Sequence, residues 1–203
     1  MELLVQNISK KYNNHFLFKD LSLSLKSNDS IAIVGQNGKG KTTLLKILLG
    51  YSPISSGKIS ILKNELETGI SYLDVSYCGV AQQIFSELTV KDLFEFHFSV
   101  RKSIDKDLSS LLAKVFPAIM LHKQCEKLSA GWLQRVKLLL ALNTDTPIVL
   151  LDEPFTNLDK QGIEIFSSLI KEMTKNRILV IASNREDEIA LCKQRFELTP
   201  NMY

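Results

Sequence analysis

The 203-residue sequence has little cysteine, no long apolar run and no basic leader. Cys78, Cys125 and Cys192 lie far apart and outside any metal-ligand spacing, so we expect buried reduced thiols rather than disulfides or a zinc site. Apolar runs such as KLLLAL fall far short of the roughly 20 residues that a membrane span needs. The start, MELLVQNISKKY, has no basic segment followed by an apolar core, unlike a signal peptide. We therefore expect a cytoplasmic protein.

Neither sign of charge dominates, because the net charge is only +3 and the charged residues are spread along the chain. This distribution favours neither a nucleic-acid-binding tail nor a polybasic membrane anchor, and we expect no nucleic-acid partner. A length of 203 residues with 45% hydrophobic content suffices for a sizeable core. We predict one domain, spanning residues 1–203.

The apolar pattern predicts an α/β fold. ELLVQNI and DLSLSLK, with a turn at NN between them, have the appearance of half-buried strands, so the chain should open with antiparallel β structure. SIAIVG, PIVLLDE and RILVIAS are nearly continuous apolar runs, typical of strands buried on both faces. Helical spacing begins at Lys41 and again over residues 160–174, so strands and helices alternate and the main sheet should be mostly parallel.

A glycine-rich loop lies between the strand at 30–35 and the helix that begins at Lys41. Residues 35–42, GQNGKGKT, match G-x-x-x-x-G-K-[ST]. The loop's backbone N–H groups, the helix N-terminus and the Lys41 charge suit the phosphates of a nucleotide, and the Thr42 hydroxyl suits Mg²⁺. A plain glycine-rich turn is the weaker alternative. The predicted nucleotide-binding residues are Gly35, Gln36, Asn37, Gly38, Lys39, Gly40, Lys41, Thr42 and Thr43.

Two acids end the buried strand IVLLDEP. Asp152 would order Mg²⁺, and Glu153 would act as the general base that polarises the attacking water, with Lys41 supplying catalytic charge. An acidic pair at a strand end is by itself more often a turn or a helix cap. Beside a phosphate loop, the catalytic interpretation is preferred.

Across its whole length the chain resembles the nucleotide-binding subunit of an ABC transporter. LSAGWLQR (128–135) resembles the signature LSGGQ-x-QR, LDEPFTNLD (151–159) resembles the Walker B and D-loop segment, and VAQQIFSELTV resembles the Q-loop. The resemblance implies a P-loop ABC-type fold with a mixed core at about 1–88 and 128–203. It also implies an antiparallel β subdomain and a helical insert at about 89–127.

The resemblance further implies ATP and Mg²⁺ as ligands and a head-to-tail dimer that encloses two ATP molecules. Tyr12 would stack on adenine, or simply pack on the first strands. Gln82 would approach the metal or the attacking water, or be a solvated loop residue. Ser129 caps a helix and, with Gly131, would form a second anion site across the dimer; a pure cap is the alternative. Asp159 of the D-loop is included among the nucleotide contacts.

The helical insert carries more aromatic residues than one buried face needs. In VKDLFEFHFSV (90–100), Val90, Leu93, Phe94 and His97 form one helical stripe, while Phe96 and Phe98 lie off it. Either these two rings are buried in a small subdomain, or one borders the groove where a separate membrane-spanning subunit docks.

Three positions depart from the family's pattern. Ala130 and Trp132 replace a glycine and the glutamine of the signature, and Asn184 replaces the usual switch histidine. The Asn184 amide can donate to a phosphate but cannot transfer a proton, so turnover should be slow. LSAG and the short chain are similar to the haem-exporter ATPase of cytochrome c maturation. The expected function is to power an ABC transporter from the inner face of the membrane. A soluble assembly ATPase of the iron-sulfur scaffold type and an ATP-gated regulatory module remain alternatives.

Overall fold

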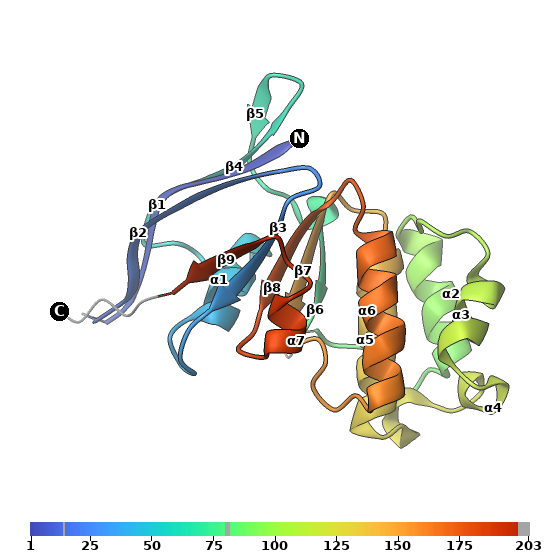
Figure 1. Cartoon of the computed structure of the whole chain (residues 1–203). Helices are drawn as coiled ribbons and strands as arrows, with labels where there is room; N and C mark the ends of the chain where they lie inside the picture. Colours follow the sequence, from blue (N-terminus) through green and yellow to red (C-terminus); the bar gives the residue numbers. More distant parts are fainter. Residues whose placement is uncertain (14, 80–81, 199–203) are drawn as a thin grey trace. The chain divides into compact units, whose positions relative to one another are not determined.

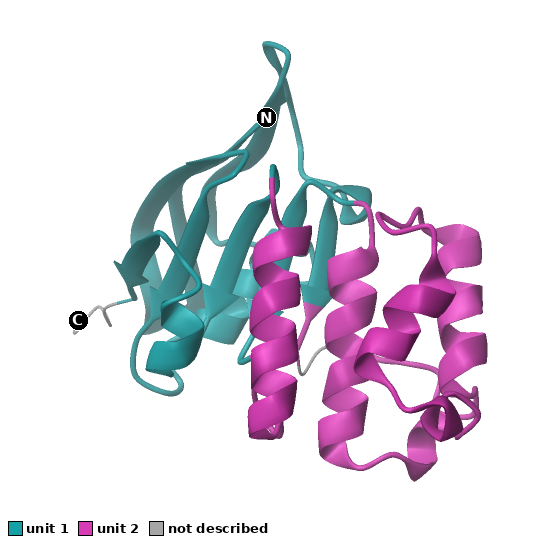
Figure 2. Cartoon of the chain, turned by 45° about the vertical axis from the view of Figure 1, so that its right-hand side comes forward, with its two compact units in different colours: residues 1–77, 146–153, 176–203 teal, residues 78–145, 154–175 magenta. Residues whose placement is uncertain are grey.

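The structure, a computed structural model, describes residues 1–13, 15–79 and 82–198. Contacts divide the chain into two compact units, coloured in Figure 2. Unit 1 comprises residues 1–77, 146–153 and 176–203, and unit 2 comprises residues 78–145 and 154–175. The single domain at 1–203, with its insert at 89–127, stays a prediction.

One sheet of unit 1 is antiparallel, with the strand order β2-β1-β4-β5 (Figure 1). Its strands are β1 (Glu2–Tyr12), β2 (His15–Lys26), β4 (Ser56–Lys63) and β5 (Leu66–Thr68). β1 pairs with both β2 and β4, and its alternating residues Leu3 and Val5 are buried. The predicted antiparallel start is confirmed, and the second asparagine of the predicted turn, at position 14, lies outside the described residues.

The second sheet of unit 1 has the strand order β6-β7-β8-β3-β9. Its strands are β3 (Ser30–Val34), β6 (Val75–Cys78), β7 (Ile148–Asp152), β8 (Ile178–Ala182) and β9 (Gln194–Glu197). β3 pairs in parallel with β8 and β9, and β7 pairs in parallel with β8. Every residue of β3, β7 and β8 is buried, as their continuous apolar runs predict.

The described part of unit 1 also contains three short helical segments: α1 (Lys41–Leu48), η1 (Tyr72–Asp74) and α7 (Glu186–Ile189). α1 contacts β7 and β8, and its leucines 44, 45 and 48 are buried. The predicted order of strand, glycine loop and helix is therefore confirmed at β3–α1. This order places the loop at the carboxyl edge of the parallel strands, where nucleotide sites form in α/β sheets.

Unit 2 is helical. Its elements are α2 (Val90–Val100), α3 (Leu108–Val115), α4 (Ala118–Leu121), η2 (Cys125–Lys127), α5 (Ala130–Asn143) and α6 (Lys160–Met173). α5 contacts α6, and α2 contacts α4 and α5. The predicted stripe of α2 turns inward, since Val90, Leu93 and Phe94 are buried.

Among the cysteines, Cys78 and Cys125 are buried and Cys192 is partly buried. No cluster of metal-binding side chains was found among the residues that the structure describes. None of the helices in the described ranges has the length and apolar composition that a membrane span requires.

Candidate functional site

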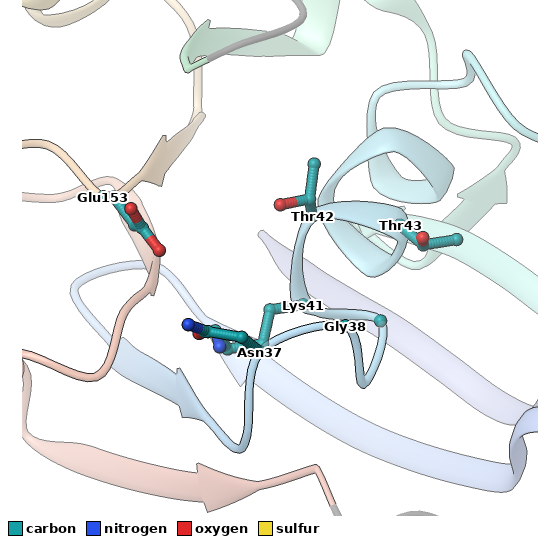
Figure 3. A pocket seen from close by; sticks show the side chains of 7 residues that line it. Asn37, Gly38, Lys41, Thr42, Thr43 and Glu153 are labelled. Atoms are coloured by element: carbon teal, nitrogen blue, oxygen red, sulfur yellow. The ribbon is translucent and has the colours of Figure 1, made fainter.

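A pocket of about 250 Å³ lies in unit 1 where the glycine loop meets the end of β7 (Figure 3). It is lined by Asn37, Gly38, Gly40, Lys41, Thr42, Thr43 and Glu153. All seven are predicted site residues, drawn from the loop, the first turn of α1 and the residue after β7. The loop and the acid that the sequence assigns to one site are therefore brought together.

The loop conformation explains its glycines. Gly38 and Gly40 have φ angles of 79° and 101°, in the left-handed region that side chains disfavour. A Cβ at Gly40 would also lie only 2.7 Å from the Leu17 side chain. The bare backbone lets the chain turn directly into α1, whose first N–H groups stay available for an anion.

Lys41 provides the positive charge of the pocket. Its side chain is buried, with 6% of its surface exposed, and its Nζ donates to the Gly35 carbonyl at 2.6 Å. The ammonium is therefore held against the loop that encloses the pocket. A charge fixed in this way is suited to phosphate oxygens.

Asp152 ends β7 as a buried carboxyl, with 6% of the residue exposed. Burial raises the pKa of Asp152 above the ordinary value, and the Glu153 charge raises it further. The Thr42 hydrogen bond and the Lys41 charge lower the pKa but do not cancel the effect of burial. Its Oδ2 atom is buried without a hydrogen-bond partner among the described residues. An unsatisfied buried carboxylate oxygen close to a hydroxyl is a donor set that suits Mg²⁺.

Glu153 follows directly and is exposed on the pocket wall. Its φ of 47° places a non-glycine residue in the left-handed region, at a cost of roughly 1 to 3 kcal/mol. Its N–H donates to the Ala182 carbonyl at 2.9 Å, which fixes the turn. The backbone at this position is thus held in a costly conformation that turns the Glu153 side chain toward the pocket (Figure 3).

Asn184, the predicted switch residue, lies two residues after β8 and contacts the loop. Its Oδ1 accepts the Gly35 N–H at 3.2 Å, and its Nδ2 donates to Asn37 Oδ1 at 3.1 Å. Both polar atoms of the amide are therefore engaged by the loop. Sequence reasoning placed Asn184 in the site but missed this pairing.

Tyr12 and three predicted loop residues, Gly35, Gln36 and Lys39, do not line the pocket. Tyr12 is 55% exposed, and Lys10 Nζ lies 4.9 Å from its ring centroid. Gln36 is exposed and Lys39 is partly exposed. Adenine stacking by Tyr12 stays a prediction.

Gln82 belongs to unit 2, and the start of the predicted Q-loop, residues 80 and 81, lies outside the described residues. The Gln82 N–H donates to the Gly79 carbonyl at 3.1 Å. Its Oε1 is buried without a hydrogen-bond partner in the described part of the chain. The assignment of Gln82 to a metal or to the attacking water stays a prediction.

The predicted signature opens α5 in unit 2. Ser129 is the N-cap and accepts the Trp132 N–H at 3.5 Å, so the predicted cap is confirmed. Gly131 has a packing role as well, because a Cβ there would lie 2.6 Å from the Asn157 carbonyl oxygen. The start of α5 is thereby held close to the segment before α6.

Asp159 is the N-cap of α6 and accepts the Gly162 N–H at 2.7 Å. The same Oδ1 accepts from Arg135 Nη2 at 2.7 Å. This backbone hydrogen bond, together with the Arg135 charge, holds the pKa of Asp159 below its ordinary value despite partial desolvation. Sequence reasoning missed Arg135, although an arginine set among apolar helix residues predicts a buried partner.

Trp132 stacks over the Arg135 guanidinium at 4.5 Å and lies 5.9 Å from the Phe116 ring. The residue that departs from the family's glutamine is thus packed into unit 2.

The sequence model of the ABC transporter family matches residues 18–156. The chain belongs to the ABC transporter family.

Individual ABC proteins show the same relationship. The cytochrome c biogenesis ATP-binding export protein CcmA of Shewanella sp. (strain MR-4) is 34% identical, covering 84% of this chain and 80% of that protein. The sulfate/thiosulfate import ATP-binding protein CysA of Mesostigma viride is 34% identical over 78% of this chain. The matched segment covers about half (47%) of the length of that relative. The similarity to a cytochrome c maturation ATPase is therefore confirmed.

Solved ABC structures share the fold of this ABC ATPase domain. A dimeric post-hydrolysis structure of the ATP-binding cassette MJ0796, bound to ADP and Pi, has a TM-score of 0.82 at 20% identity and covers 97% of this chain and 94% of that one. This likeness confirms the predicted mixed α/β ABC-type fold. Unit 1 contains the phosphate loop, Asp152, Glu153 and Asn184. Unit 2 contains Gln82, Ser129, Gly131 and Asp159.

Proposed function

We propose that this chain is the ATP-binding and ATP-hydrolysing subunit of an ABC transporter that powers separate membrane-spanning subunits. The observation that carries the proposal is the unit 1 pocket, which combines a buried lysine, open helix N–H groups and a facing glutamate. These groups complement a polyphosphate and a water molecule rather than an apolar ligand.

The chain's own residues have separate tasks in this reaction. The loop N–H groups and Lys41 bind the β- and γ-phosphates and stabilise the charge that develops on them. Glu153 orients a water molecule and accepts its proton as the general base. Thr42 and Asp152 of unit 1 would hold Mg²⁺, which when bound would neutralise phosphate charge, and Gln82 as a further ligand stays a prediction of the sequence. Tyr12 stacks on the adenine ring.

The proposed working unit is a pair of ATPase subunits, either two copies or one copy with a homologue. Ser129 and Gly131 at the start of α5 bind the phosphate held by the other subunit, and Asp159 lies in the segment that contacts it. The dimeric form of the ATP-binding cassette MJ0796 supports this arrangement. Closing two subunits over ATP and reopening them after hydrolysis supplies the mechanical step.

The proposed membrane partner docks on unit 2, at the inner face of the membrane. Phe85 and Phe96 form an edge-to-face pair with centroids 5.3 Å apart, and 56% and 47% of their surfaces are exposed. Exposed aromatic pairs serve as anchors in helix-in-groove interfaces. Of the two aromatic residues off the buried stripe, Phe96 is the exposed one, so it is the better anchor.

Glu153→Gln tests the proposal, because it removes the base while keeping the size of the side chain. The variant should bind ATP, hydrolyse it far more slowly than the natural protein and accumulate as a dimer in gel filtration with Mg-ATP. ADP should not produce that dimer. A Glu153→Gln protein that stays monomeric and hydrolyses ATP at the natural rate would refute the assignment.

A further inference from the structure

The Asn184 side chain forms hydrogen bonds that contact with a γ-phosphate does not explain. Its acceptor takes the Gly35 N–H at 3.2 Å, and its donor reaches Asn37 Oδ1 at 3.1 Å. One amide thus spans the first part of the phosphate loop, from its opening residue to a residue that lines the pocket. We propose that Asn184 is a positioning residue that tethers the phosphate loop and thereby sets the affinity of the loop for nucleoside diphosphates.

The sheet register places Asn184 at this point. β3 and β8 are parallel, with Ile33 opposite Ala182, so continuing the register by two residues puts Asn184 opposite Gly35. The intervening Ser183 is fully buried, and its N–H donates to the Ile33 carbonyl at 3.1 Å. Its Oγ accepts the Arg185 N–H at 2.9 Å. These hydrogen bonds fix the backbone on both sides of Asn184 independently of the bonds that its side chain forms.

At Gly35 the tether and the phosphate-binding lysine meet. The Gly35 N–H donates to Asn184, while its carbonyl accepts from Lys41 Nζ at 2.6 Å. The same residue is packed on a third side, because a Cβ there would lie 2.8 Å from the Leu198 carbonyl oxygen. Any loss of the Asn184 bond loosens the residue against which Lys41 is held.

At Asn37 the tether reaches the pocket itself. In Figure 3 the Asn37 side chain extends from the loop toward the side on which Glu153 lies. Since asparagine offers one acceptor and two donors, Asn184 can hold Gly35 and Asn37 at once. A loop already held in its binding conformation loses less conformational freedom when a diphosphate binds.

ADP is the discriminating ligand, because it lacks the γ-phosphate that a switch residue would contact. A net hydrogen-bond contribution at an exposed site corresponds to about a two- to fivefold change in affinity. We expect Asn184→Ala and Asn37→Ala each to weaken ADP binding by about that factor in calorimetry. The double variant should bind about as weakly as the weaker single variant, since both changes break one tether. Gln194→Ala, an amide removed from the exposed face of β9, is the matched control and should bind ADP normally.

A nucleotide-free measurement separates this inference from the proposed function, on which it rests. By NMR, the Gly35 amide should exchange faster in Asn184→Ala than in the natural protein, with melting temperatures within about 2 °C of each other. Unchanged Gly35 exchange, unchanged ADP affinity in Asn184→Ala, or multiplying effects in the double variant would each overturn the tether. Failure of the natural protein to bind ADP would instead overturn the proposed nucleotide site.

Discussion

Replacing Asp152 by asparagine should make the metal-free protein more stable while impairing its response to Mg²⁺. The carboxyl is 6% exposed, and its Oδ2 is buried without a hydrogen-bond partner among the described residues. Burial raises its pKa because a carboxylate loses solvation there. Thr42 and Lys41 compensate this buried charge only in part, so the charge lowers the free energy of unfolding and its removal should raise that free energy.

The size of the effect follows from the single unsatisfied oxygen. Leaving a buried polar group unpaired costs about 1 to 3 kcal/mol, and asparagine still buries one polar group of its own. We therefore expect a gain near the lower end, about 1 kcal/mol. For a chain of this size, that corresponds to a rise of about 2 to 4 °C in melting temperature.

The assay is thermal unfolding at neutral pH, first with EDTA and then with Mg-ADP. With EDTA, Asp152→Asn should melt above the natural protein, and with Mg-ADP the order should reverse, because the natural protein gains more from the bound metal. Glu153→Gln makes the same chemical change at an exposed neighbour and should move the EDTA melting point by less than about 2 °C. An Asp152→Asn protein that melts below the natural one in EDTA would contradict the account of the strand end.

Two further predictions concern unit 2. Burial, with a contribution from the Arg101 charge, lowers the pKa of His97 to about 4, so its contribution to stability is present above pH 6.5 and is lost as the pH falls toward 4. Urea titrations should show this loss, of no more than about 3 kcal/mol, in the natural protein and not in His97→Gln. Gly131→Ala should lower the free energy of unfolding by up to about 2 kcal/mol, because a clash of about 1 to 3 kcal/mol with the Asn157 carbonyl exceeds the helix-propensity gain of about 1 kcal/mol. Gly69→Ala, where an added Cβ meets nothing within 4 Å, is the control, and equal effects of the two alanines would argue against the clash.

Much of the fold could be predicted because burial and spacing act locally. The apolar run of β3, the glycines after it and the leucine spacing of α1 are adjacent in the chain, so one stretch specifies strand, loop and helix. The same holds for α2, whose observed span of Val90–Val100 is the predicted segment. By contrast, β9 is the short polar segment QRFE, and only pairing with β3 makes it a strand.

The motifs of the sequence predict residues of the candidate site but not the hydrogen bonds between them. The loop motif and the acidic pair supply every residue that lines the pocket except Thr43, although Gly35, Gln36, Lys39 and Asp152 do not line it. The contact of Asn184 with Asn37 joins residues 147 positions apart and depends on the register of β3 against β8. The Arg135 bond to Asp159 likewise depends on how α5 packs on α6. No local pattern encodes either arrangement.

The measurement that tests the central claim most directly is phosphate release from Mg-ATP by the natural protein and by Lys41→Ala. A lysine that contacts a charged oxygen contributes about 1.5 to 3 kcal/mol, so its loss should slow turnover by about tenfold to hundredfold and weaken ATP binding as well. Lys46→Ala removes the same charge from the last turn of α1 and should release phosphate at the natural rate. Natural turnover in Lys41→Ala, or none in the natural protein with Mg-ATP, would contradict ATP hydrolysis at this loop.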